Sequence, residues 1–207
     1  MSWANIITLS RLPLLLVYLA LLFSDHFSYR LTSLLLLIII FLMDWFDGYV
    51  ARLRQEVTTL GAVLDVALDR AVENMLWVVF LSIQLVPLWI PLLFLVRSFL
   101  VDGLRGVAVR QGHSVFGMMH SPWGKFLVSS RFMRALYGFA KAWVFCQLTL
   151  THTLAILYPQ GYPGLFTLNQ VLLYAVAGLC VLRGVPVLLD SRLYLSSPSA
   201  APPTNRP

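Results

Sequence analysis

Long apolar runs separated by short polar stretches are the dominant pattern of this sequence. A helix of about 20 mostly apolar residues is long enough to cross the hydrocarbon core of a membrane. We therefore predict an all-α fold, an integral membrane bundle of about six transmembrane helices, at residues 6–24, 31–50, 62–83, 86–107, 126–151 and 169–189.

The last part of the chain has a different character from the apolar runs. Residues 191–207 are rich in proline and serine, which predicts a disordered tail after a single membrane domain at residues 1–190. No small-residue cleavage site follows the first apolar run. We expect this run to be retained as the first span.

The composition excludes an ordinary soluble domain. The chain is 59% hydrophobic and 12% charged, whereas a soluble domain carries about 25% charged residues. The net charge of +6 would suggest a nucleic-acid partner in a soluble protein. Here the cations fall between apolar runs, so we predict membrane lipids as partners and no nucleic acid.

Cations concentrate in two of the predicted connections. Arg52 and Arg54 lie between the second and third spans, and Arg105, Arg110 and Lys125 lie around the connection between the fourth and fifth. Cytoplasmic loops carry an excess of Lys and Arg. We expect a multi-pass protein of the cell (inner) membrane, with these connections and both termini facing the cytoplasm.

Four of the nine acidic residues, Asp44, Asp47, Asp65 and Asp69, lie at one predicted helix–loop–helix hairpin. The spacings of three and four residues place each pair on one helix face. Clustered carboxylates at the membrane edge repel one another unless a counter-charge is bound. An all-oxygen ligand set favours Mg²⁺ or Mn²⁺, and shared carboxylates can hold two ions.

Small residues accompany the aspartates. Gly48 and Ala51 follow Asp44 and Asp47 by four residues, and Gly61 precedes Asp65 by four. Without bulky side chains on these faces, a ligand can approach the helix backbone closely. The next residue after Ala51 is Arg52, whose guanidinium is suited to binding phosphate.

The segment DWFDGYVARLRQEVTTLGAVLDVALD resembles the CDP-alcohol phosphotransferase signature, which is DxxDGxxAR, eight residues, then GxxxDxxxD. The resemblance implies transfer of a phosphatidyl group from CDP-diacylglycerol to an acceptor hydroxyl, with release of CMP. It also implies a homodimer. By position, it implies that Asp44, Asp47, Asp65 and Asp69 bind metal, that Asp69 also deprotonates the acceptor, and that Gly48, Ala51, Arg52 and Gly61 contact the CDP moiety.

The acceptor is indicated by a second resemblance. Asn5, Thr8, Arg11 and Pro13 are spaced as at the start of phosphatidylglycerophosphate synthases, and later basic positions are also similar. Ser98, Leu127 and Val128 depart from that pattern. The resemblance implies that a small phosphorylated acceptor, glycerol 3-phosphate, is bound through its phosphate by Arg97, Arg105, Arg110 and Lys125.

Other readings remain open. Inositol phosphate, serine or another polyol could be the acceptor in the same chemistry. A divalent-cation transporter is the alternative of another class, but its carboxylates should lie near the bilayer midplane rather than at span ends. The pattern leaves open the roles of Glu73, His113 and His120, and of the charged residues in or beside spans: Arg97, Asp102, Arg131, Arg134, Lys141 and Arg183.

The predicted orientation can be tested by labelling. Single cysteines at Arg54 and His113, in a chain with Cys146 and Cys180 replaced by Ala, should react with an impermeant thiol reagent only from the cytoplasmic side. A cysteine at Gln160 should react only from the opposite side. The reverse labelling pattern in oriented vesicles would contradict the orientation inferred from charge.

Overall fold

The computed structural model describes residues 3–53, 59–110, 122–158, 160–161 and 163–195. Within these ranges, only the backbone is described for residues 3–7, 47–53, 59–60, 62, 105, 108–110, 122 and 191–195. His113 and His120 lie outside the described residues.

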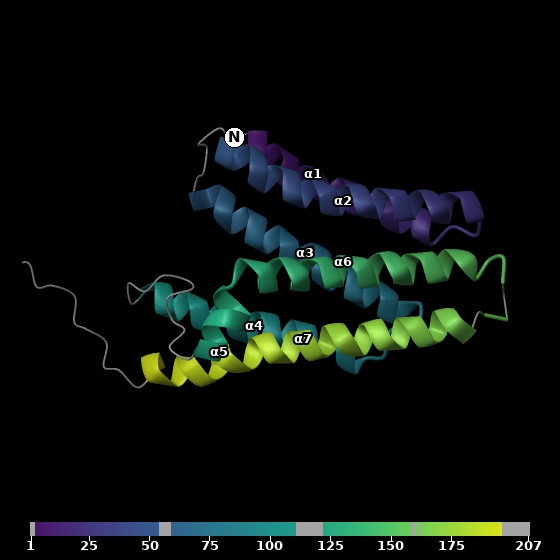
Figure 1. The fold of residues 1–207 in the computed structure, drawn as a ribbon. Helices are drawn as coiled ribbons and strands as arrows, with labels where there is room; N and C mark the ends of the chain where they lie inside the picture. The colour runs from purple at the N-terminus through teal and green to yellow at the C-terminus, as the bar shows by residue number, and fades with distance from the viewer. Residues whose placement is uncertain (1–2, 54–58, 111–121, 159, 162, 196–207) are drawn as a thin grey trace, which may run out of the picture. The chain divides into compact units, whose positions relative to one another are not determined.

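The elements of the described chain are helical (Figure 1), which confirms the predicted all-α class. Apolar runs favour helices because a helix pairs its backbone groups internally, as a membrane requires. The helices are α1 (Trp3–Leu22), α2 (Phe27–Leu53), α3 (Thr59–Ser82), α4 (Trp89–Arg110), α5 (Pro122–Gly124), the π-helix η1 (Lys125–Ser129), α6 (Arg131–Leu154) and α7 (Pro163–Leu195).

The helix boundaries differ from the predicted ones by a few residues throughout, including at the fifth run and at the C-terminal end. The fifth run was expected to begin a continuous span at residue 126, but the helix is interrupted at Ser130, whose φ of −60° and ψ of 133° are not helical. The span expected there therefore begins with α6 at Arg131. At the other end of the chain, α7 continues to Leu195, and residues 196–207 lie outside the described part.

Apolar surface is exposed along several helices. Among the described residues, two helical stretches are long and apolar enough to cross a membrane, Phe27–Phe46 and Pro163–Asp190, and Thr8–Leu22 is a shorter apolar stretch. Only 17% of the Phe27–Phe46 window is buried, so this helix is not the core helix of a soluble protein. These features are those of a membrane protein, in which lipid covers the apolar side chains.

The chain forms two compact units, and α4, α6 and α7 contribute residues to both. Residues 1–91 and 141–173 make the first unit, and residues 92–140 and 174–207 the second. The single domain predicted over residues 1–190 therefore stays a prediction.

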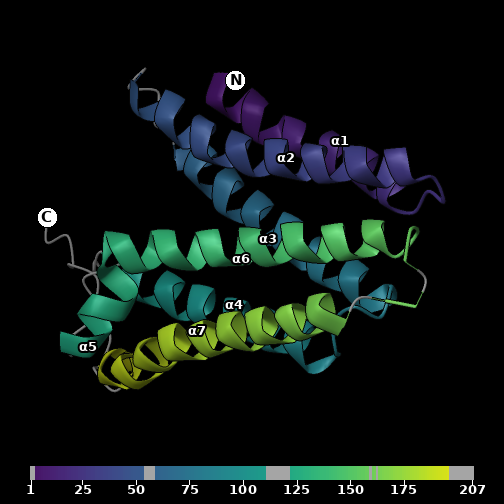
Figure 2. The ribbon, with the colours of Figure 1, turned by 45° about the vertical axis from the view of Figure 1, so that its right-hand side comes forward.

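In the first unit, α1 and α2 run side by side in both views (Figures 1 and 2). The core of this unit gathers around Phe145 of α6. Its ring centroid lies 4.6 Å from that of Trp77 and 6.0 Å from that of Phe80, both on α3, and 6.2 Å from that of Phe41 on α2. Aromatic pairs at these separations add to the free energy gained by burial alone. They hold α2 and α3 each against Phe145 of α6.

Hydrogen bonds between helices supplement this packing. The hydroxyl groups of Tyr18 on α1 and Thr149 on α6 are 3.0 Å apart, and Asn169 on α7 donates to Thr151 Oγ1 on α6 at 3.0 Å. In a membrane, polar side chains of this kind hold helices together by satisfying one another.

The second unit has its own apolar cluster. Val101 of α4, Val128 of η1 and Val187 of α7 are buried together, with Leu104 and Leu127 packed against them. This cluster fixes the π-helix against two longer helices. A π-helical stretch is uncommon and is frequently found at functional sites.

Candidate functional site

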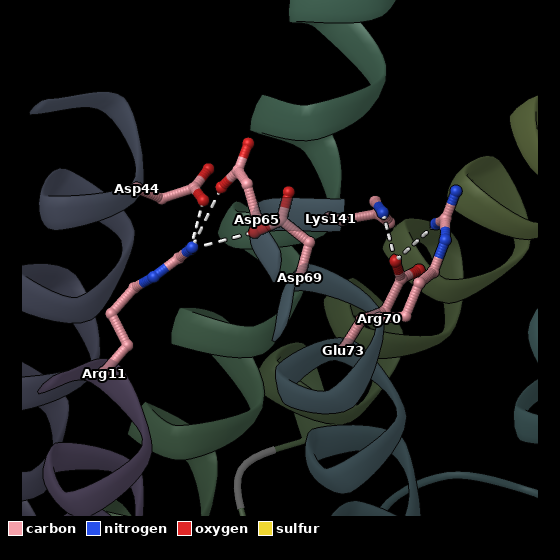
Figure 3. Close-up of polar contacts among 7 residues, drawn as sticks. All are labelled: Arg11, Asp44, Asp65, Asp69, Arg70, Glu73 and Lys141. Carbon is pink, nitrogen blue, oxygen red and sulfur yellow. Dashed lines mark hydrogen bonds and ion pairs between the residues drawn. The ribbon is translucent and has the colours of Figure 1, made fainter. Parts of the chain in front are cut away.

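Three of the four predicted aspartates come together in the first unit (Figure 3). Asp44 lies on α2, and Asp65 and Asp69 lie one turn apart on α3. Each offers a carboxylate oxygen, and these oxygens lie within 4.8 Å of one another. The helical spacing predicted the pair on α3, and the packing of α1 against both α2 and α3 brings Asp44 to it.

Arg11 of α1 contacts all three carboxylates. Its Nη1 donates to Asp69 Oδ1 at 2.8 Å and also bonds Asp44 Oδ1, and its Nη2 donates to Asp65 Oδ1 at 3.1 Å (Figure 3). The Arg11 side chain is 2% exposed, whereas the aspartate side chains are 43–45% exposed. The guanidinium therefore lies on the buried side of the cluster, and the carboxylates face outward.

The cluster fits a divalent cation in its chemistry and its charge. Its donors are carboxylate oxygens, which suit Mg²⁺ or Mn²⁺. With all groups ionised, three carboxylates and one guanidinium carry 1 − 3 = −2 in net charge. The three oxygens lie within 4.8 Å of one another, which is close enough for small shifts of the side chains to bring them around one ion.

The other residues of the predicted nucleotide site are only partly described. Gly61 lies on α3, one turn before Asp65, and is partly exposed. The remaining predicted positions lie on the α2 backbone, but their side chains are outside the described residues: Asp47, Gly48, Ala51 and Arg52.

In the second unit, two arginines flank one aromatic ring. The guanidinium carbon of Arg97 on α4 lies 5.6 Å from the centroid of Tyr137, and that of Arg183 on α7 lies 5.2 Å from it. Arg183 also donates from Nη1 to the Leu127 carbonyl of η1 at 2.8 Å. Cation–π contacts of this kind stabilise a guanidinium that is shielded from water.

Gly184 of α7 lies close to the Arg97 side chain of α4. A Cβ atom added there would lie 3.2 Å from Cγ of Arg97. Arg183 is 4% exposed and Arg97 is partly buried, so neither side chain simply extends toward the water at the membrane surface.

The remaining predicted acceptor residues are less fully defined. Lys125 is exposed at the first position of η1. Arg105 and Arg110 lie on α4, but their side chains are outside the described residues. The structure thus places Arg97 beside Arg183, and the set predicted from sequence stays a prediction.

The sequence model of CDP-alcohol phosphatidyltransferases matches residues 1–182, which are most of the chain and contain the carboxylate cluster and Arg97. The chain belongs to this family.

Curated relatives in the family agree in the type of reaction that their names describe. The chain is 33% identical over 90 residues to a CDP-diacylglycerol–glycerol-3-phosphate 3-phosphatidyltransferase of Bacillus subtilis, a match that covers 44% of this chain and 47% of the relative. A Rickettsia typhi protein of the same name is 32% identical over 101 residues, 49% of this chain and 57% of the relative.

A third relative has a different name. A putative cardiolipin synthase of Mycobacterium bovis is 32% identical over 99 residues, 48% of this chain and 46% of the relative. The matches thus span about half the length of the curated relatives.

Two buried arginines, Arg11 and Arg183, were not assigned to a site from the sequence. Arg11 was noted only as part of the NxxTxxR spacing near the N-terminus, and Arg183 only as a cation within an apolar run. Both are buried by partners on other helices. An arginine within an apolar run was the available signal, because a buried charge must have a partner.

Glu73, whose role the sequence left open, forms an ion-pair network next to the cluster (Figure 3). It lies one turn beyond Asp69 on α3, is 8% exposed, and accepts hydrogen bonds from Lys141 Nζ of α6 at 2.6 Å and from Arg70 Nη1 at 3.3 Å. The network connects α3 to α6. Glu73 therefore helps to position the helix that carries Asp65 and Asp69.

We predict that Glu73→Gln destabilises the protein, because it leaves the Lys141 ammonium without its charged partner. Breaking a well-buried pair costs about 3–5 kcal/mol, and partial exposure of Lys141 reduces this to about 2 kcal/mol. The melting temperature in detergent should fall by about 5 °C.

The control for this prediction is Asp25→Asn. Asp25 is fully exposed where it pairs with Arg30, so this substitution should change the melting temperature little. Lys141→Met should restore part of the stability of Glu73→Gln. Additive losses in the double variant would show that the two side chains are not coupled.

Proposed function

We propose that the chain transfers a phosphatidyl group from CDP-diacylglycerol to an acceptor hydroxyl and releases CMP, in a reaction that depends on a divalent metal. The observation that carries the proposal is the cluster of Asp44, Asp65 and Asp69, whose oxygens lie within 4.8 Å of one another. These residues belong to the family signature, and membership of the family supports the type of reaction.

The carboxylates are the residues that would hold the metal. Asp44, Asp65 and Asp69 supply oxygen ligands, and Asp47 of the signature is the fourth. When bound by these carboxylates, Mg²⁺ or Mn²⁺ would supply positive charge to neutralise the pyrophosphate of the donor and to stabilise CMP as the leaving group. The outward-facing carboxylates leave this side of the cluster accessible to the nucleotide.

Asp69 is proposed as the general base. The acceptor oxygen attacks the phosphorus that carries the diacylglycerol, its proton passes to the Asp69 carboxylate, and the bond from that phosphorus to the CMP oxygen breaks. The Asp69 side chain is 45% exposed, so an acceptor can reach it. Glu73, one turn away and bonded to Lys141, holds this part of α3 in place.

Glycerol 3-phosphate is the proposed acceptor. The names of the Bacillus subtilis and Rickettsia typhi relatives include this substrate, which supports the assignment. Its phosphate requires cations, and Arg97, Lys125, Arg105 and Arg110 are proposed to supply them. Arg183, beside Arg97 at Tyr137, joins this set on the basis of its position.

A second acceptor is suggested by the name of the Mycobacterium bovis relative, putative cardiolipin synthase. With phosphatidylglycerol as acceptor, the same attack by a hydroxyl group would yield cardiolipin.

We also propose that the enzyme works as a homodimer. The carboxylate cluster is proposed to lie at the cytoplasmic face of the membrane, because the cations are concentrated in the connections on that side.

Asp69→Asn should lower turnover by on the order of a hundredfold or more, because the amide cannot accept the proton but keeps the shape of the side chain. Binding of CDP-diacylglycerol, measured at saturating Mg²⁺, should change little. Turnover within a few-fold of the unmodified enzyme would contradict the role of general base.

The matched variant for this prediction is Asp65→Asn, which removes a ligand but not the base. It should shift the Mg²⁺ titration of activity to higher concentration, since a neutral amide is a poorer ligand. An unchanged titration would remove Asp65 from the metal site.

The acceptor can be identified with labelled CDP-diacylglycerol and a panel of glycerol 3-phosphate, phosphatidylglycerol, inositol phosphate and serine, followed by chromatography of the lipid product. Lys125→Gln and Arg97→Gln should raise the KM for glycerol 3-phosphate about tenfold to a hundredfold, because each loses a charge-assisted contact to the phosphate. The KM for CDP-diacylglycerol should change much less.

Arg131→Gln is the control for the acceptor variants, because Arg131 is an exposed cation of the same unit that we do not assign to the site. It should leave both KM values unchanged. Faster turnover of another acceptor, with the KM values of Lys125→Gln and Arg97→Gln unchanged, would refute glycerol 3-phosphate as the acceptor. The proposed transferase reaction would not be contradicted by that result.

A further inference from the structure

Arg11 is the most completely buried charged side chain at the carboxylate cluster. It is 2% exposed and comes from α1, whereas its three partners come from α2 and α3. A buried guanidinium is costly unless it is paired and hydrogen-bonded. Here the pairing is to the same carboxylates that suit a metal ion.

Charge balance separates the role of Arg11 from that of the metal. The four signature aspartates carry −4 when ionised, and two divalent ions carry +4, so the loaded cluster is neutral without arginine. Without metal, three of these carboxylates would repel one another within a partly buried site. Arg11 then supplies the positive charge that keeps them together.

The contacts also place the guanidinium and a metal in competition. Nη1 and Nη2 of Arg11 bond one oxygen of each carboxylate, at 2.8 Å for Asp69 and 3.1 Å for Asp65. An ion bound to these oxygens at about 2.1 Å would lie next to the guanidinium, and the two cations would repel each other.

We propose that Arg11 is a positioning residue that acts as the counter-cation of the metal-free site: it holds Asp44, Asp65 and Asp69 together and gives up their oxygens when metal binds. The inference rests on the proposed metal dependence. Arg11 therefore stabilises the metal-free protein and lowers its affinity for metal. Because Arg11 lies on α1, its contacts make the packing of this helix depend on whether metal is bound.

The test compares Arg11→Gln with the unmodified full-length enzyme in detergent, by melting temperature in EDTA and in saturating Mn²⁺, and by calorimetric titration with Mn²⁺. In EDTA, Arg11→Gln should melt at least about 5 °C lower, because the carboxylates lose their counter-charge. Its Kd for Mn²⁺ should fall by on the order of tenfold. The difference in melting temperature should therefore shrink in saturating Mn²⁺.

Arg30→Gln is the matched control. Arg30 is also an arginine of the first unit that joins helices, since it bonds the carbonyl groups of Ser24 and His152, but it does not contact the cluster. It should lower the melting temperature equally with and without Mn²⁺ and leave the Kd unchanged. The same behaviour in Arg11→Gln would overturn the proposal, and so would weaker Mn²⁺ binding.

Arg11→Lys provides a second test if Arg11→Gln does not fold. Lysine keeps the charge but cannot reproduce the forked contacts to three carboxylates. It should restore most of the stability in EDTA and bind Mn²⁺ more tightly than the unmodified enzyme. Unchanged or weaker binding would overturn the proposal, whereas no Mn²⁺ binding by the unmodified enzyme would also refute the proposed metal dependence.

Discussion

The arrangement of the first unit depends on the attraction between one buried guanidinium and three carboxylates. Arg11 contributes a single positive charge from α1, and the aspartates contribute three negative charges from α2 and α3. This interaction connects three helices at one point. It leaves an excess negative charge on the accessible side, which is where the proposed divalent cation would be held.

The apolar and polar contacts between α3 and α6 also hold the carboxylate cluster in place. Trp77 and Phe80 on α3 pack against Phe145 on α6, and Glu73 on α3 pairs with Lys141 on α6. Because Asp65 and Asp69 are on α3 as well, their positions follow from the way that this helix is held. The proposed catalytic role of Asp69 requires such support, since small displacements at a reacting centre reduce the rate severely.

The second unit uses a different means of keeping cations away from water. Arg97 and Arg183 lie against the ring of Tyr137, and Arg183 bonds a carbonyl group of the π-helix. These contacts stabilise the guanidinium groups away from water. A pair of arginines held in this way is suited to an anionic group, which is the reason for including Arg183 in the proposed acceptor site.

The sequence by itself determined the helical class, the approximate extent of six long helices and the spacing of Asp65 and Asp69. It did so because apolar length and the helical repeat act within one segment. It also contained the signature that leads to the family. The break at Ser130 was not predicted, although Ser129, Ser130 and Arg131 interrupt the apolar run at this point.

Only the tertiary structure decided which charges are partners. Arg11 is 33 residues from Asp44 and 58 from Asp69, and Arg97 meets Arg183 at a tyrosine of a third helix. No spacing along one helix specifies such contacts. They arise when helices pack closely enough to bury charged groups, and a buried charge is then stable only beside the partner that packing brings to it.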